Sequence, residues 1–535
     1  MRTRKSSSAA ASSNAVAKPK PAIVPRRETD PMFRIALLIV GAVTFLRLLW
    51  LAGQPIDLYP DEAQYWVWAQ KFQFGYYSKP PMIAWLIWAT THLFGDTDLA
   101  VKISAPLLYA FTSLFVHGIA KRLYDARIAA WSTIAFITLP AVSLSALIVS
   151  TDVPLLLCWA AATYGFVRAR EPGGARWWIL VGVAGGLGLL SKYAMGFWLA
   201  SALGFLVLVP DERRHVKPFL LSLALTLAVY APNFIWNATN GFVSYLHTRD
   251  NANVRDYGLH PQAFAEFAGA QFGVFGPIFL GTLIVIVAGL RRVGADRRAL
   301  LLMSFALPTL AIMLVESMLS RAQPNWSAPT YLTATILVVA YLTQKGRDGL
   351  VQWSVVLHVA LCVLLLGARD ISAAVGHPLA GKLDPLHRVR GWQTLGSSLS
   401  QIRLQHLDLP LLADQRELTA ALMYYMQPHP FEMRMWNPAG HVKNGFEMDN
   451  SLAGTPGGDY LWITQRTGAE RQEVFDRFAE HVPVAHVVVP LGRGLARDVT
   501  VYKLTGFKGY GDPAPGSPTA DGAKTPSDEP AAPRP

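Results

Sequence analysis

The chain has 535 residues, of which 52% are hydrophobic and only 16% are charged, and its formal net charge is +12. Soluble domains carry about 25% charged residues, so this composition excludes an ordinary soluble protein. Long apolar stretches fill residues 33–367 and the charges gather between them, which indicates a polytopic membrane protein. Most basic residues lie in short connectors, where they act as topology signals, so we expect no nucleic-acid binding. Cys158 and Cys362 lie inside apolar segments, which favours packing over a disulfide framework or a zinc site.

Residues 1–32 are rich in Ala, Ser, Pro, Lys and Arg, and we predict a disordered cytoplasmic N-terminus. The transmembrane region is predicted at residues 33–369. A span needs about 20 apolar residues. The predicted spans are residues 33–51, 99–120, 128–147, 153–167, 177–190, 194–209, 219–236, 264–290, 299–315, 328–343 and 351–367. The expected fold class is an all-α polytopic membrane protein with about eleven transmembrane helices, followed by a small C-terminal α/β domain on the outer face.

Basic residues concentrate in every second connector between the predicted spans. Five short connectors hold 15 Lys and Arg in total, and they are residues 121–127, 168–176, 210–217, 291–298 and 344–348. The opposite connectors hold few basic residues over much longer segments. The positive-inside rule therefore predicts a cytoplasmic N-terminus and an outer C-terminus. For a bacterial cell this means a multi-pass protein of the inner (plasma) membrane, with the outer segments in the periplasm.

Three outer segments follow from this topology. The first is residues 52–98, in which the apolar run 82–94 is too short to span and is expected to lie along the membrane interface. The second is the polar segment 237–262. The third, residues 370–510, has strand-like runs at 459–464, 484–490 and 499–504 and a helical stretch at 417–426, which predict a periplasmic α/β domain. The tail, residues 511–535, is predicted to be disordered.

Charged side chains from five distant parts of the sequence fall at the same predicted outer interface. They are Asp61, Glu62, Lys79, Asp152, Lys192 and Arg321. Charges at membrane depth are costly and commonly functional. Carboxylates can deprotonate an acceptor hydroxyl, and cations can stabilise a departing phosphate, so this set suits group transfer from an anionic lipid phosphate.

Asp61 is the candidate general base, with Glu62 beside it, and the alternative is that Asp61 only caps a helix after Pro60. Lys79, next to Tyr77, is the candidate phosphate ligand, and the alternative is an interfacial lysine that reaches the membrane surface. Asp152 is a candidate for catalysis or for helix capping.

Four further residues are substrate-binding candidates. Lys192 and Tyr193 follow a Gly-rich predicted helix, where a simple outer anchor is the alternative. Arg321 and Asn325 lie in RAQPNW, residues 321–326, which could instead be an aromatic belt. The sequence predicts no metal site and no cofactor, and a divalent ion bound by Glu62 and a loop histidine is the alternative.

Three motifs resemble a known family. They are DEAQYW (61–66), GYYSKPPM (75–82) and TDVPLL (151–156). Together they resemble the GT-C glycosyltransferases, and in particular the dolichyl-phosphate-mannose-protein mannosyltransferase family in the wide sense. That family includes bacterial aminoarabinose and galacturonic acid transferases of lipid A and lipopolysaccharide core. The resemblance covers residues 33–367. It departs from the aminoarabinose branch at Gln64, where that branch has an arginine, and at Ser78, where it has an acidic residue.

The resemblance implies an inverting transfer from a polyprenyl-phosphate sugar to lipid A, lipopolysaccharide core or another envelope glycan. The partners it implies are this donor, a glycolipid or glycan acceptor, and membrane lipid. Asp61 matches the family's catalytic acid in the first outer loop, Lys79 its phosphate lysine and Asp152 its second acidic position. A lipid-linked sugar flippase and a membrane scaffold are the competing interpretations. Transporters usually show paired halves, and no such repeat is visible in the sequence.

Overall fold

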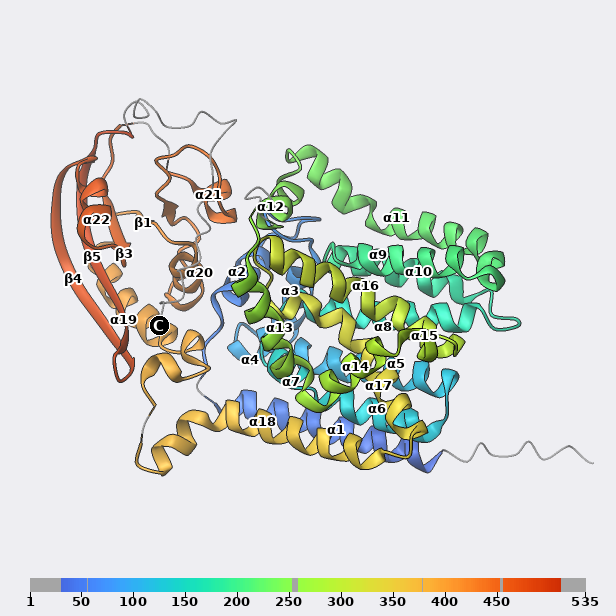
Figure 1. Cartoon of the computed structure of the whole chain (residues 1–535). Helices are drawn as coiled ribbons and strands as arrows, with labels where there is room; N and C mark the ends of the chain where they lie inside the picture. Colours follow the sequence, from blue (N-terminus) through green and yellow to red (C-terminus); the bar gives the residue numbers. More distant parts are fainter. Residues whose placement is uncertain (1–29, 55, 253–257, 378, 453–455, 511–535) are drawn as a thin grey trace, which may run out of the picture.

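The computed structural model describes residues 30–54, 56–252, 258–377, 379–452 and 456–510. A bundle of helices forms one part of the molecule, and the C-terminal domain covers one end of that bundle (Figure 1). The short helix α15 (Leu290–Val293), in an arginine-rich connector, lies at the opposite end (Figure 1). Helix α1 begins at Pro31, capped by Asp30, so residues 31 and 32 are helical rather than disordered. The other predicted disordered residues, 1–29 and 511–535, lie outside the described residues.

Each of the eleven predicted spans is helical. The bundle helices are α1 (Pro31–Gly53), α5 (Ser104–Leu123), α6 (Ala126–Thr138), α7 (Pro140–Ser145), α8 (Asp152–Ala169), α9 (Trp177–Ser191), α10 (Met195–Leu208), α11 (Val216–Thr239), α13 (Pro261–Phe275), α14 (Pro277–Ala288), α16 (Arg297–Leu319), α17 (Ala328–Gln344) and α18 (Asp348–Ala374). Within the described residues, five helices are long and apolar enough to cross a membrane, or six if the bent pair α13–α14 is one span. The count of eleven spans therefore stays a prediction.

The predicted span 128–147 is broken between α6 and α7, where Leu139 leaves helical geometry ahead of Pro140. A proline removes a helical hydrogen bond and frees carbonyl groups that must find other donors inside a membrane. Arg47 of α1 supplies one, because its buried guanidinium donates to the Ile137 carbonyl at 2.6 Å and to the Ser143 hydroxyl at 3.0 Å. This arginine therefore stabilises the break.

The predicted span at residues 264–290 is not one continuous helix in the structure. Helices α13 and α14 meet at an angle of 116°. The bend lies at Gly276, whose φ of 84° is in the left-handed region that favours glycine. A Cβ there would lie 2.4 Å from Nε2 of His358, so the close packing of α18 against this corner also requires glycine.

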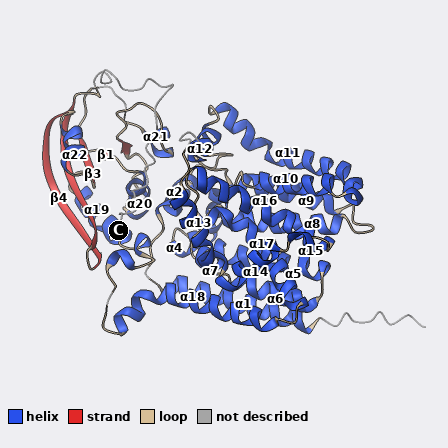
Figure 2. Cartoon of the chain, in the orientation of Figure 1, coloured by secondary structure: helices blue, strands red, loops and turns tan. Residues whose placement is uncertain are grey.

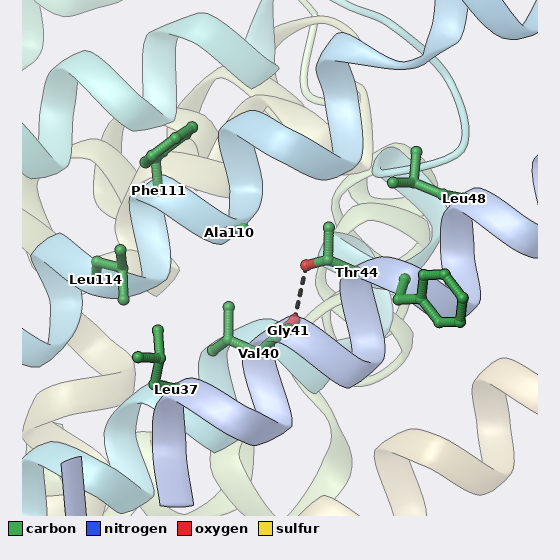
Figure 3. A pocket seen from close by; sticks show the side chains of 9 residues that line it. Leu37, Val40, Gly41, Thr44, Leu48, Ala110, Phe111 and Leu114 are labelled. Atoms are coloured by element: carbon green, nitrogen blue, oxygen red, sulfur yellow. Dashed lines mark hydrogen bonds between the residues drawn. The ribbon is translucent and has the colours of Figure 1, made fainter. Parts of the chain in front are cut away.

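The faces of α1 and α18 that point away from the bundle are apolar and exposed. Leu38 and Trp353 are 71% and 67% exposed, which is the pattern of a lipid-facing surface. A recess of about 290 Å³ opens between α1 and α5 (Figure 3). Its one hydroxyl, on Thr44, donates to the Val40 carbonyl at 2.7 Å, so the recess presents only apolar surface. Helix α17, in contrast, is almost completely buried and forms the centre of the bundle.

Short helices lie at the end of the bundle that faces the C-terminal domain. They are α2 (Pro60–Ala69), α3 (Met82–Phe94), α4 (Asp98–Lys102) and α12 (Val243–Ala252). Helix α3 coincides with the apolar run predicted at residues 82–94. The second outer segment, predicted as a polar loop, is largely helical, because α11 continues to Thr239 and α12 follows. Residues 253–257 of this segment lie outside the described residues.

Strands occur only in the C-terminal part of the described chain (Figure 2). Five strands form one sheet in the order β2-β1-β3-β5-β4, in which β1 is parallel to β2 and β3, and the β3–β5 and β4–β5 pairs are antiparallel. The strands are β1 (Leu411–Ala413), β2 (Arg434–Met435), β3 (Tyr460–Thr464), β4 (Phe478–Gly492) and β5 (Leu495–Phe507), and the helices are α19 (Trp392–Leu404), α20 (Arg416–Tyr425), α21 (Gly445–Asn450) and α22 (Gly468–Phe475). The three predicted strands and the predicted helix are all present, and the α/β character is confirmed.

The C-terminal domain is attached to the first outer segment by buried hydrogen bonds. The Asp57 carboxylate accepts the backbone N–H of Trp392 at 2.6 Å. The Tyr425 hydroxyl donates to Asp98 at 2.8 Å and accepts the backbone N–H of Leu58 at 2.6 Å. Because each bond joins the two parts of the chain, α20 is held directly over α2.

Candidate active site

Helix α2 is anchored by Glu62, whose side chain is completely buried. The carboxylate accepts the N–H of Tyr59 at 2.8 Å, which caps the helix, and the N–H of Val149 at 2.7 Å. It also forms an ion pair with the buried Lys102 of α4. Burial raises the pKa of Glu62, and Lys102 opposes that rise. Glu62 thus joins three separate segments, and it is Glu62, not Asp61, that caps the helix.

Asp61 precedes Glu62, and successive residues of a helix point about 100° apart. With Glu62 directed into the protein, Asp61 faces the C-terminal domain and remains 40% exposed. Its carboxylate Oδ1 accepts a hydrogen bond from Nη1 of Arg416 at 2.7 Å, and the same nitrogen donates to Oε1 of Gln64 at 2.6 Å. Burial opposes the charge of Arg416, but the adjacent Asp61 raises the pKa of this guanidinium above its ordinary value.

A second carboxylate, Asp152, begins α8. It accepts a hydrogen bond from Nζ of Lys192 at 2.7 Å and another from Nδ2 of Asn325 at 2.9 Å. These partners come from the end of α9 and from the short 3-10 helix Pro324–Ser327. The carboxylate therefore joins three predicted site residues from distant parts of the sequence.

Lys79 lies in the segment between α2 and α3, and the charges of both carboxylates act on its ammonium group. Burial and the nearby Lys192 lower the pKa of Lys79, and Asp61 and Asp152 oppose this effect. Among the described residues, the structure gives the Lys79 ammonium no hydrogen bond or ion pair. A partly buried cation in this state would gain from an anionic ligand, because an opposite charge would restore its preference for the protonated form.

Tyr77 and His247 show how α12 closes one side of the cluster. Their rings lie 5.1 Å apart, and the Tyr77 hydroxyl donates to the Val442 carbonyl of the C-terminal domain at 3.1 Å. Burial, with added repulsion from Lys79 and Arg416, lowers the pKa of His247 to about 4. His247 is therefore neutral at neutral pH.

The remaining two sequence candidates lie differently. The Tyr193 hydroxyl donates to Oδ1 of Asn233 at 3.4 Å and accepts from Nδ2 of Asn237 at the same distance, so it joins the turn between α9 and α10 to α11. Arg321 is exposed in the loop after α16 and is not among the described partners of Asp61, Asp152 or Lys79. In the described part of the chain, no three His, Cys, Asp or Glu side chains are placed to hold a metal ion.

Two residues that shape the candidate site, Lys102 through Glu62 and Arg416 directly, were not predicted. Lys102 lies inside the predicted span 99–120, and a lone lysine in an apolar span is a signal that could have found it. Arg416 gives no such signal, because it precedes an ordinary amphipathic helix and meets Asp61 only through the docking of two domains. Together, Asp61, Asp152, Lys79, Lys192 and Arg416 form a site with two carboxylates and three cations, which favours an anionic ligand and leaves Asp61 partly exposed.

Comparison with known proteins places the chain in a family. Residues 78–236 match the family described as dolichyl-phosphate-mannose-protein mannosyltransferase. A lipid A galacturonosyltransferase of Rhizobium johnstonii is 31% identical over 81% of this chain and 91% of its own length. The chain belongs to this GT-C family. A lipopolysaccharide core galacturonosyltransferase of the same organism is 27% identical over 71% of the chain and 82% of its own length.

This membership makes the protein a multi-pass membrane glycosyltransferase. The fold agrees. The crystal structure of ArnT from Cupriavidus metallidurans bound to undecaprenyl phosphate is similar with a TM-score of 0.60 at 16% identity, covering 88% of this chain and 97% of that one. The arrangement of the helices is therefore that of the GT-C fold.

Proposed function

We propose that this glycosyltransferase takes its sugar from a polyprenyl-phosphate donor and transfers it to lipid A or lipopolysaccharide core. The observation that carries the proposal is the gathering of Asp61, Lys79 and Asp152 at one end of an apolar bundle. The partly exposed carboxylate of Asp61, near a lysine ammonium that no described residue binds, suits a hydroxyl acceptor and a phosphate leaving group. The names of the two Rhizobium relatives support the acceptors, and support a hexuronic acid as the transferred sugar.

In the proposed reaction, Asp61 accepts the proton of the acceptor hydroxyl as the oxygen attacks the anomeric carbon. A new bond from the acceptor oxygen to C1 forms while the bond from C1 to the phosphate oxygen breaks, with inversion at C1. The polyprenyl phosphate leaves with the bonding electrons, and the Lys79 ammonium stabilises its developing charge. Lys192, held by Asp152, adds positive charge on the same side.

Two of the predicted catalytic residues take positioning roles in this proposal. Glu62 has its carboxylate enclosed by Lys102 and two backbone N–H groups, so it orients α2 and thereby Asp61. Asp152 has both oxygens engaged, one by Lys192 and one by Asn325, so it fixes the Lys192 ammonium. Neither group has to exchange a proton for the transfer to proceed.

The proposed site lies on the periplasmic face of the bacterial inner membrane. The arginine-rich connectors support this orientation, because they are expected on the cytoplasmic side. Single cysteines introduced in the connector 291–298 and in α21 would be tested with a membrane-impermeant thiol reagent on spheroplasts. The cysteine in α21 should react in intact spheroplasts, and the cysteine in the connector should react only after lysis. The reverse pattern would refute the orientation.

The function itself is tested by reconstitution. Purified protein in proteoliposomes is given a radiolabelled polyprenyl-phosphate hexuronate and lipid A. We expect label in lipid A, release of free polyprenyl phosphate in equal amount, and an inverted anomeric configuration in the product. Movement of intact donor between leaflets without cleavage would instead identify a flippase, and labelled lipid A without release of polyprenyl phosphate would exclude this donor.

A further inference from the structure

The guanidinium of Arg416 binds the site through one nitrogen only. Nη1 donates to both Asp61 and Gln64. Nη2 lies 3.8 Å from the Glu417 carboxylate, which is beyond hydrogen-bond length, and the described residues give Nε no hydrogen bond. The side chain is 31% exposed. The edge formed by Nε and Nη2 is therefore open beside the candidate base.

This edge has the geometry that carboxylates prefer. An arginine presents two parallel N–H groups that match the two oxygens of a planar carboxylate. The chain uses the same edge elsewhere, because Nε and Nη2 of Arg170 bind the two carboxylate oxygens of Glu212. On Arg416 the corresponding pair of donors faces no carboxylate of the described chain at hydrogen-bond distance, so a ligand can supply one.

We propose that Arg416 binds the carboxylate of a uronic acid sugar on the donor and holds that sugar against Asp61. The inference rests on the proposed function and extends it to a residue of the C-terminal domain. In a hexuronate, the carboxylate is carried by C5, and C5 and the anomeric C1 flank the same ring oxygen. A carboxylate bound at the Nε–Nη2 edge therefore places C1 near the carboxylate that Nη1 holds.

The other cations of the site suit this role less well. Lys192 is engaged by Asp152 at 2.7 Å. Lys79 has a single ammonium, a point charge that serves a phosphate without the two-pronged geometry of a guanidinium. The three cations therefore bind different groups of the donor: Lys79 and Lys192 bind its phosphate, and Arg416 binds the carboxylate of its sugar. The C-terminal domain thereby takes part in donor selection.

The test compares two donors that differ only at C5. Polyprenyl-phosphate hexuronate and the matching hexose, with CH₂OH in place of the carboxylate, are assayed in proteoliposomes with the wild type, Arg416→Gln and Arg416→Lys. Hydrogen bonds to a charged group correspond to roughly 10- to 100-fold in kcat/KM. We expect the wild type to prefer the hexuronate by about that factor. Arg416→Gln removes the contact with Asp61 and should lower kcat/KM for both donors, but the hexuronate should lose a further factor of roughly 10 to 100, which abolishes the preference. Arg416→Lys should retain part of the preference.

Arg388→Gln is the matched control, because Arg388 binds Glu417 next to Arg416 at 3.0 Å and makes no described contact with Asp61. Its donor preference should equal that of the wild type. Equal losses for both donors in Arg416→Gln would show a merely structural role and overturn the inference. A wild type without preference would overturn it even if the variants fail to fold. No transfer from either donor would refute the proposed function instead.

Discussion

Loss of either partner of the buried ion pair between Glu62 and Lys102 should destabilise the protein, whereas replacement of both partners should not. Both side chains are at most 2% exposed. Removal of one partner of a buried pair leaves an uncompensated charge and costs about 3–5 kcal/mol, whereas replacement of both is often neutral. We therefore expect Glu62→Gln and Lys102→Met each to lower the free energy of unfolding by about that amount. The double variant should recover most of the loss.

Thermal unfolding of the detergent-solubilised protein, followed by tryptophan fluorescence, measures these differences. In Lys102→Met, Glu62 loses its counter-charge, so its folded-state pKa rises further above the unfolded value. The stability that the protonated group contributes is fully present below the unfolded pKa and is lost as the pH rises through the raised folded pKa. The deficit of Lys102→Met should therefore grow as the pH rises above the ordinary range of a glutamate.

The control is the exposed pair of Arg297 and Asp211, 2.7 Å apart, where Arg297→Met should cost less than about 1 kcal/mol. A double variant at Glu62 and Lys102 that is less stable than both single variants would refute the reasoning. So would single variants as stable as the wild type.

Three further predictions address the phosphate ligand, the domain contact and the second carboxylate. The pKa of Lys79 is lowered from its usual 10.5, so the affinity of the protein for polyprenyl phosphate should fall as the pH rises toward that lowered value. Lys79→Arg should keep its affinity for polyprenyl phosphate at higher pH than the wild type, because the guanidinium stays protonated. Identical pH profiles of binding for the two proteins would contradict the assignment. Asp57→Ala removes the carboxylate that accepts the Trp392 N–H at 2.6 Å. The start of α19 should lose about 1–3 kcal/mol of local stability, measured as faster backbone hydrogen exchange there. Unchanged exchange would argue against the docking contact. Asn325→Leu removes the 2.9 Å donor to Asp152 and should lower the transfer rate by roughly 10-fold without a change in Tm; a wild-type rate would show that this bond is dispensable.

Much of the fold was predictable because membrane spans and strands leave strong local patterns. The run at residues 82–94 and the strands near 459–464, 484–490 and 499–504 all appear at or within a few residues of their predicted positions. Bends were not predictable from apolar character alone. The corner at Gly276 depends on a positive φ and on His358 of a distant helix.

The candidate site was predictable only in part. Asp152, Lys192 and Asn325 were each selected as charged or polar residues at outer helix ends, and the structure brings them within hydrogen-bond distance. The role of Glu62 depends on which way each residue of α2 faces, and a pair of adjacent carboxylates in the sequence does not reveal this. Arg416 depends on tertiary contact between two domains, for which a single sequence holds no periodic signal.

The central claim, that Asp61 is the general base, is tested most directly by transfer in proteoliposomes with Asp61→Asn. Asp98→Asn is the matched control, because Asp98 also lies near α2 and binds the C-terminal domain, at 2.8 Å from the Tyr425 hydroxyl. A general base contributes about 10²- to 10⁴-fold. Asp61→Asn should therefore lose transfer by at least about 100-fold while its Tm stays near that of the wild type, and Asp98→Asn should keep most of its activity. Transfer by Asp61→Asn at the wild-type rate would contradict the account.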